Sequence, residues 1–193
     1  MAELKTESKV TPAELQELLF YDPDTGLFLW KPRPLRFCVE GRGRYTRERN
    51  KSVFDSNYAG KPALTCHNPN GYLRGNLFGR SLMAHRAAFA CVLGRWPKGQ
   101  VDHINGVRDD NRWENLREAT NQQNQWNSSS AKNSSSRYVG VSWDTYACKW
   151  GAYICPENRK VHLGYFSCEI EAAKVRDRAA KEVFGEYARI NLP

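Results

Sequence analysis

Residues 101–124 constrain the fold of this chain more than any other segment. "VDHI" predicts a short strand, Asn105-Gly106 a tight turn, and "NLREAT" (115–120) a second strand that pairs with the first. Thr120 and Gln123 form a capping box, so a helix should begin there and run through "NQQNQWN". The segment therefore predicts two strands joined by a loop and followed by a helix.

Three polar side chains of this segment have the chemistry of a hydrolytic metal site. Hydrolysis of a phosphodiester needs an activated water and a cation that neutralises the charge building on the phosphate. His103 suits the first task, because an unperturbed histidine pKa of about 6.5 suits a general base. Asp102 and Asn124 offer hard oxygen ligands, and the first turns of the helix would let Asn124 face back towards Asp102. The alternative is an ordinary polar hairpin.

"DHINGVRDDNRWENLREATNQQNQ" resembles an HNH (ββα-metal) nuclease of the phage and homing-endonuclease type. The family pattern is Asp-His, an Asn twelve residues after the His, and a His or Asn nine residues later; this chain has His103, Asn115 and Asn124 there. The resemblance implies that His103 activates water and that Asp102 and Asn124 bind Mg²⁺, with Mn²⁺ as a possible substitute. It implies that Asn115 holds the loop and orients His103.

The region before this motif predicts a helix followed by several strands. Residues 11–20 should form the helix, with Thr11 as N-cap and Glu14 completing a capping box. The patterns that follow predict a turn at 24–26 between two strands, a hairpin within 57–84 turning at Asn70-Gly71, and a helix over 84–97 stopped by Gly94 and Pro97. Residues 31–51 carry eight basic residues against two acidic ones and predict a mobile loop, which either follows a phosphate backbone or is simply solvated.

Several polar residues near the motif call for separate hypotheses. His85 is expected to be a hydrogen-bonded core histidine packed under the hairpin rather than a ligand. Arg86 would face a phosphate or pair with a carboxylate, and His67 belongs to no recognisable group of site residues. Asp109 and Asp110 are expected to be solvated, because the family spacing does not select them.

Residues 129–136 predict a flexible Ser/Asn-rich linker, and residues 137–193 a compact unit of their own. Three alternating runs within 137–167 predict a three-stranded antiparallel sheet, with Val161 and Leu163 buried. A capped helix over 167–185 should pack on this sheet through a stripe of Ala172, Val175, Ala179 and Val183.

This unit is similar to the Apetala/ethylene-response-factor (ERF) DNA-binding domain. The resemblance rests on positions that include Tyr138, Gly140, Trp150, Ala152, Gly164, Asp177, Gly185 and Asn191. It implies that the sheet face opposite the helix meets duplex DNA. The candidate contacts on this chain are Ser142, Trp143, Lys149, Tyr153, Lys160 and His162. Because Val139, Ser142 and Cys155 stand where plant members place arginines, the plant target sequence is not transferable.

A net charge of +8 favours a polyanionic partner such as nucleic acid. The six cysteines form no C-x-x-C pair, which argues against a zinc ribbon. No secretory signal or bilayer-spanning stretch is visible, so we expect a soluble cytoplasmic protein, in a bacterial host cell by the resemblance to phage enzymes. We expect no membrane partner and no small-molecule ligand.

The sequence therefore predicts an α+β chain: a β-rich region with a basic loop (1–80), an HNH nuclease motif (81–128), a linker (129–136) and an ERF-like domain (137–193). The predicted function is metal-dependent hydrolysis of DNA by an enzyme tethered to the duplex through its C-terminal domain. The alternative is a regulator that binds specific DNA sequences without cutting. The sequence leaves open whether one or both strands are cut, and whether the protein is a monomer or a homodimer.

Overall fold

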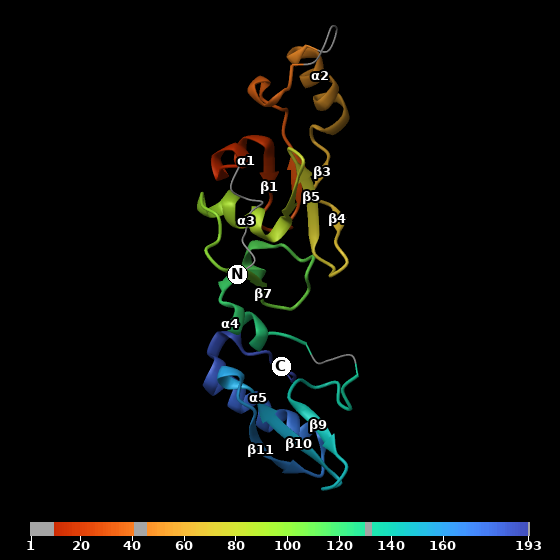
Figure 1. The fold of residues 1–193 in the computed structure, drawn as a ribbon, viewed down its shortest axis with the longest axis vertical. Helices are drawn as coiled ribbons and strands as arrows, with labels where there is room; N and C mark the ends of the chain where they lie inside the picture. The colour runs from red at the N-terminus through yellow and green to blue at the C-terminus, as the bar shows by residue number, and fades with distance from the viewer. Residues whose placement is uncertain (1–9, 41–45, 130–132, 193) are drawn as a thin grey trace. The chain divides into compact units, whose positions relative to one another are not determined.

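The computed structural model describes residues 10–40, 46–129 and 133–192. The chain divides into two compact units, of which the first ends at Glu118 and the second begins at Ala119 (Figure 1). The division falls inside the segment that the sequence predicts as one nuclease motif. Within the described ranges, no helix is both long enough and apolar enough to cross a membrane.

The first unit opens with α1 (Pro12–Leu18), capped by Thr11 and Glu14 as predicted. The strands β1 (Leu19–Tyr21), β2 (Phe28–Trp30) and β3 (Pro62–Ala63) form an antiparallel sheet in that order. The predicted turn at residues 24–26 joins β1 to β2 and is confirmed. Asp22 accepts hydrogen bonds from the amide of Asp24 and the hydroxyl of Thr25 in this turn.

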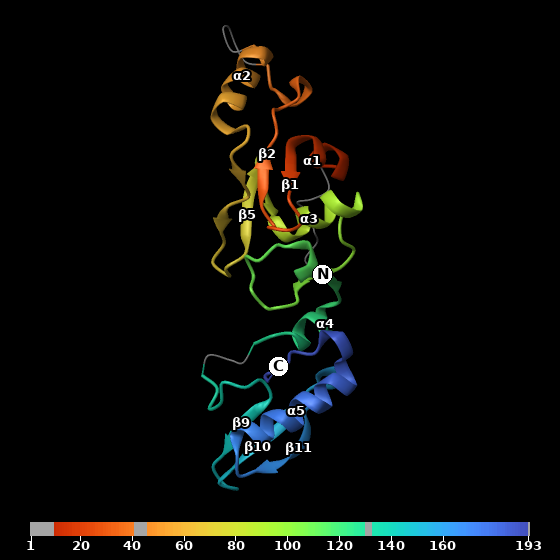
Figure 2. The same cartoon turned by 180° about the vertical axis from the view of Figure 1, so that it is seen from behind.

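A second antiparallel sheet contains β4 (Cys66–His67), β5 (Leu73–Leu77) and β6 (Arg80–Met83). The predicted turn at Asn70-Gly71 lies between β4 and β5. The helix α3 (Ala84–Leu93) follows and ends at Gly94, whose φ of 63° is left-handed, as the predicted stop requires. The helices α1 and α3 lie side by side, as both views show (Figure 2).

The core of the first unit contains residues from the predicted β-rich region (1–80) and from the predicted nuclease motif (81–128). Its apolar side chains come from α1, the β1–β2 hairpin, β5, β6, α3 and the strands β7 (Gln100–His103) and β8 (Leu116–Ala119). They include Leu15, Leu18, Phe28, Leu77, Ala87, Phe89, Val101 and Leu116. The region before the nuclease motif and the strands of that motif therefore share one core.

The prediction of a loop over residues 31–51 is wrong in part. Leu35–Phe37 form a short 3-10 turn, and residues 47–51 begin the helix α2 (Arg47–Tyr58); residues 41–45 lie outside the described residues. The side chain of Thr46 caps α2, and Phe54 packs edge-on against Trp30 under the guanidinium of Arg33. None of the residues of α2 is buried, so the sequence carries no apolar stripe that would have predicted this helix.

The predicted hairpin forms from β7 (Gln100–His103) and β8 (Leu116–Ala119), with a short 3-10 turn at Trp113–Asn115 before β8. In the second unit, α4 (Asn121–Trp126) begins at Thr120 with the predicted capping box completed by Gln123. The local order of strand, loop, strand and helix is therefore confirmed.

The C-terminal part of the second unit is the predicted antiparallel sheet packed on one helix. Its strands are β9 (Val141–Asp144), β10 (Lys149–Ile154) and β11 (Val161–Phe166), with β10 in the middle. The helix α5 (Glu169–Phe184) covers one face of the sheet, and short 3-10 turns lie at Pro156–Asn158 and Gly185–Tyr187. Ala152 and Ile154 of β10 are buried.

Three details of this unit differ from the prediction. The buried stripe of α5 is Ala172, Ala173, Arg176, Asp177, Ala180 and Phe184, whereas Val183 is 49% exposed. Arg176 pairs with Asp177, and the carboxylate of Asp177 accepts the backbone amides of Asn191 and Leu192. This charged pair therefore occupies the helix face that the pattern gave to valines.

The predicted side-chain cap of the helix is absent, because Cys168 stands at the N-cap. Val161 is exposed because it opens β11 beside the turn at Pro156–Asn158.

The predicted linker covers residues 130–132, which lie outside the described residues. Its last residue is part of the second unit: the hydroxyl of Ser136 donates to the carboxylate of Glu169 at 2.7 Å and accepts the amide of Tyr138. Ser136 is buried.

Candidate active site

The strand β7 ends on the two adjacent residues that the sequence singles out, and both are buried. Asp102 and His103 are each 4% exposed. The Nε and Nη2 atoms of Arg117, on the paired strand β8, donate to Oδ2 of Asp102 at 2.9 and 2.7 Å. A buried carboxylate requires such a partner, because desolvation of an unpaired charge is costly. The hairpin therefore places one carboxylate next to one imidazole.

His103 lies against two other rings of the first unit. Its ring meets that of His85 edge-on with 5.3 Å between centroids, and the ring of Tyr72 lies 5.7 Å away. Burial lowers the pKa of His103 from the usual histidine value, and the contact with Asn111 and the nearby carboxylates of Asp102 and Asp110 oppose that change. A lowered pKa keeps the imidazole neutral at neutral pH, which is the form that accepts a proton.

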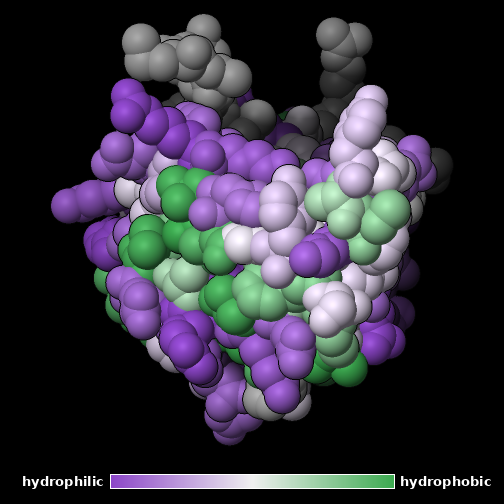
Figure 3. Space-filling model, turned by 90° about the horizontal axis from the view of Figure 1, so that it is seen from below, coloured by the Kyte–Doolittle hydropathy of each residue, from purple (hydrophilic) through white to green (hydrophobic). Residues whose placement is uncertain are grey.

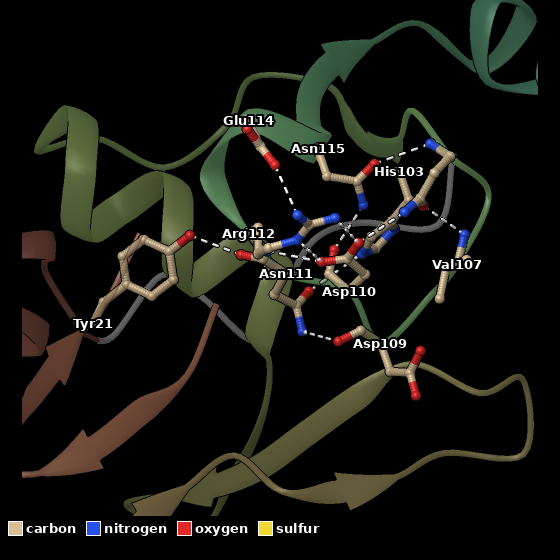
Figure 4. A network of polar contacts seen from close by, with 10 residues as sticks. Tyr21, His103, Val107, Asp109, Asp110, Asn111, Arg112, Glu114 and Asn115 are labelled. Carbon is tan, nitrogen blue, oxygen red and sulfur yellow. Dashed lines mark hydrogen bonds and ion pairs between the residues drawn. The ribbon is translucent and has the colours of Figure 1, made fainter. Parts of the chain in front are cut away.

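Asn115 connects the two ends of the loop between β7 and β8 (Figure 4). Its Oδ1 accepts the amide of Asn105 at 2.9 Å, and its Nδ2 donates to the carbonyl of Asp110 at 2.8 Å. The predicted tight turn is present, since the amide of Gly106 donates to the carbonyl of His103 at 2.8 Å. Asn115 therefore contacts the loop, while its catalytic role stays a prediction.

The expectation that Asp110 is solvated is wrong. Its carboxylate accepts hydrogen bonds from the guanidinium of Arg112 and from the side-chain Nδ2 of Asn105, and these contacts lower its pKa to about 2. Asp109 is half exposed, with its carboxylate 3.3 Å from Nε2 of His67, so His67 also has a partner that the sequence gave no reason to expect. Both aspartates belong to the loop that passes beside His103.

Two upstream residues, His85 and Arg86, lie in the first turn of α3. His85 is buried as predicted, but its Nδ1 has no hydrogen-bond partner among the described residues, and burial together with His103 lowers its pKa to about 3. For Arg86, pairing with a phosphate or a carboxylate stays a hypothesis. Arg86 is buried, and it donates to the carbonyls of Gly99 at 2.9 Å and Pro97 at 3.2 Å. Arg86 thus ties α3 to the chain that leads into β7.

Sequence reasoning missed Asn111 and Tyr21. Asn111 is only 1% exposed and lies with Oδ1 3.2 Å from Nε2 of His103. The hydroxyl of Tyr21, on β1, donates to the backbone carbonyl of Asn111 at 2.7 Å. Asn111 looked like an ordinary turn residue in a polar loop, and no sequence signal links it to a tyrosine ninety positions earlier.

The last predicted ligand, Asn124, lies in the first turns of α4 and belongs to the second unit. Asp102 and Asn124 would supply a carboxylate and an amide oxygen, which are hard donors suited to Mg²⁺. Arg117 donates from Nε and Nη2 to Oδ2 of Asp102 and so holds this carboxylate in place. Across the part of the chain that the structure describes, no three His, Cys, Asp or Glu side chains cluster as a metal site.

The second candidate surface is the face of the C-terminal sheet opposite α5. Strand register places Lys149 opposite Asp144, Ser142 opposite Gly151, and Tyr153 opposite His162 on this face. The ammonium of Lys160 lies 4.0 Å over the ring of Tyr153. Tyr165, which the sequence did not single out, lies with its ring tilted against that of His162, 4.4 Å between centroids, and its hydroxyl donates to Asp144 at 2.9 Å.

Trp143 does not belong to this surface. It is opposite Trp150 in the register and meets that ring edge-on at 5.1 Å, on the face that α5 covers. The structure therefore brings together five of the six predicted DNA contacts. The face of the molecule seen in Figure 3 carries both hydrophilic and hydrophobic residues. Large exposed side chains in the second unit include Tyr146, Val161, Tyr165 and Ile170.

Comparison with known proteins shows what the segment that carries this site is similar to. Residues 82–126 match the family model of the HNH endonucleases, so the predicted resemblance is confirmed and the family implies nuclease activity. The segment begins at β6 and ends at the last residue of α4, and it contains Asp102, His103, Asn115 and Asn124.

Two relatives each match part of the chain. Protein 3.8 of Escherichia phage T7 is 28% identical over 106 residues, covering 54% of this chain and 87% of the phage protein. The putative dehydration-responsive element-binding protein 2H of Arabidopsis thaliana is 45% identical over 58 residues, 29% of this chain. The chain spans only 36% of that plant protein's length. No solved structure matches significantly.

Proposed function

We propose that this chain is a metal-dependent DNA endonuclease of the HNH type. The observation that carries the proposal is the position of His103: it is buried at the end of β7, beside Asp102, within the segment that matches the HNH family model. In this proposal His103 is the general base that takes a proton from the attacking water. Asn115 keeps the loop beside His103 in place through its two hydrogen bonds.

Asp102 and Asn124 are the residues that would hold the metal in this proposal, with Mg²⁺ as the physiological ion and Mn²⁺ as a substitute. When bound, the cation neutralises the negative charge that develops on the scissile phosphate. Arg117 holds the carboxylate of Asp102 in one orientation through two hydrogen bonds. By family resemblance, the reaction leaves a 5′ phosphate and a 3′ hydroxyl.

The second unit would anchor the enzyme on duplex DNA through the sheet face that carries Lys149, Tyr153, Lys160 and His162. Lysines beside aromatic rings suit a phosphate backbone, and tethering raises the local concentration of DNA at the catalytic site. The likeness of the chain, over 58 residues, to a plant protein named as a putative dehydration-responsive element-binding protein supports the assignment.

Replacing Lys149 and Lys160 together by alanine should raise the Kd for duplex DNA about tenfold at physiological salt and reduce the slope of log K against log salt by about 1 to 2. The matched control is Lys174→Ala with Lys181→Ala, because both lysines are exposed on α5. Fluorescence anisotropy across a salt series measures both quantities. Equal weakening by the two double variants would argue against the sheet face as the anchor.

The competing function is a DNA-binding regulator that does not cut. The test is incubation of supercoiled plasmid and phage genomic DNA with the protein and Mg²⁺, followed by DNA ligase. The nuclease predicts open-circular or linear plasmid that ligase reseals, because the ends carry 5′ phosphate and 3′ hydroxyl. The ratio of the two products tells single-strand nicking from double-strand cutting. Intact DNA with a clear gel shift would favour the regulator.

A further inference from the structure

Two segments that are ninety residues apart in the sequence meet at Asn111. The side chain of Asn111 faces His103 on β7, and its backbone carbonyl accepts the hydroxyl of Tyr21 on β1 (Figure 4). Trp113, two residues further on, donates its amide to the carbonyl of Pro23 at 2.9 Å. The corner between β1 and β2 therefore holds the loop that passes beside the proposed general base.

The orientation of the Asn111 amide follows from its second contact. Its Nδ2 donates to the carbonyl of Asp109 at 3.2 Å, which leaves Oδ1 on the side of His103. An amide oxygen can only accept, so the Nε2 atom of His103, 3.2 Å away, must donate and must carry the proton of the neutral ring. The lone pair of the neutral imidazole then lies on Nδ1.

We propose that Asn111 is a positioning residue that fixes His103 as the Nε2–H tautomer, and that Tyr21 and the β1–β2 corner hold Asn111 in place. The inference rests on the proposed function, in which His103 accepts a proton from water. A general base is effective only if its lone pair faces the proton it takes. Loss of the Asn111 acceptor would remove the contact that favours the Nε2–H tautomer, and a fraction of the molecules would then turn an N–H towards the water.

The packing around Asn111 supports a fixed geometry. Asn111 is almost completely buried, and a Cβ atom on Gly26 would lie 2.5 Å from the backbone carbon of Asn111 and from the amide nitrogen of Arg112. The close approach of the two backbones therefore depends on glycine at position 26. Burial raises the pKa of Tyr21, so its hydroxyl stays protonated and remains a donor to the Asn111 carbonyl.

The test uses the full chain labelled with ¹⁵N and ¹³C at histidine, with His103→Gln to assign the His103 signals. Ring chemical shifts without metal or DNA distinguish the two tautomers. Wild type should show His103 as the single Nε2–H form, and Asn111→Leu, similar in size but without an acceptor, should show a mixture. Asn111→Asp, which keeps an acceptor, should restore the Nε2–H form.

Cleavage rates give the second measurement. Asn111→Leu should lower kcat about ten- to a hundredfold with the Kd for DNA nearly unchanged, and Asn111→Asp should recover part of the loss. Tyr21→Phe removes one hydroxyl at a buried ring and should lower kcat several-fold, whereas Tyr58→Phe, on α2, is the matched control. If Asn111→Leu does not fold, Tyr21→Phe alone decides through the same two measurements.

The outcomes separate this inference from the proposed function. An unchanged His103 tautomer and unchanged kcat in Asn111→Leu and Tyr21→Phe, in a protein that cuts DNA, would overturn the inference alone. A tautomer shift in a protein that never cuts DNA would support the positioning by Asn111 while the proposed function fails.

Discussion

Replacing His103 by alanine should lower the rate constant of DNA cleavage at saturating DNA by about 10² to 10⁴-fold, the usual contribution of a general base. The buried imidazole is neutral at neutral pH and has no substitute nearby, because His85 is itself buried, with a pKa lowered to about 3. The Kd for DNA should stay within about twofold of wild type, since a buried side chain adds little to the binding surface.

The measurement is single-turnover cleavage of a labelled duplex, with anisotropy on the same preparations. His67→Ala is the matched control, because His67 is a largely exposed histidine of the same unit. Cleavage by His103→Ala at the wild-type rate would rule out His103 as the base. Loss of cleavage together with loss of DNA binding would indicate damage to the fold instead.

Replacing Gly26 by alanine should lower the free energy of unfolding by about 3 kcal/mol or more. Gly26 has a φ of +72°, and its new Cβ would meet backbone atoms of Asn111 and Arg112 at 2.5 Å. Backbone atoms cannot move aside as the end of a flexible side chain can. The β1–β2 corner and the loop beside His103 must therefore separate, and cleavage should fall along with stability.

Gly60→Ala distinguishes the two causes of this loss. Gly60 has a similar φ of +77°, but a Cβ there would have no atom within 4 Å. Gly60→Ala should therefore lower the free energy of unfolding only by the strain of a left-handed alanine, about 1 kcal/mol. Urea unfolding followed by tryptophan fluorescence measures both variants. Equal destabilisation by the two substitutions would show that the contact of residue 26 with the backbone of Asn111 and Arg112 adds nothing to stability.

Local sequence signals predicted the parts of the site that lie close together along the chain. The capping box of Thr120 and Gln123 satisfies amides at the start of α4, so the beginning of that helix is readable without tertiary structure. The same holds for the turn at Gly106 and for the alternation of β10, which point to local backbone geometry and to one buried face. The HNH spacing adds the adjacent pair Asp102 and His103.

The contacts that hold this site in place depend on tertiary packing. The hydrogen bond from Tyr21 to Asn111 joins residues ninety positions apart, and neither residue type nor periodicity indicates it. In α5, the buried pair Arg176 and Asp177 reads as polar in the sequence, so the predicted apolar stripe was displaced towards Val183. Helix α2 escaped prediction because it buries none of its side chains.

Metal removal and restoration is the measurement that tests the proposed nuclease most directly. Supercoiled plasmid is incubated with the full chain in EDTA, and excess Mg²⁺ is then added to the same sample. The account predicts intact plasmid in EDTA and nicked or linear plasmid after Mg²⁺, because Asp102 and Asn124 are the proposed ligands of a required cation. Cleavage at the same rate in EDTA, or no cleavage after Mg²⁺ is restored, would contradict it.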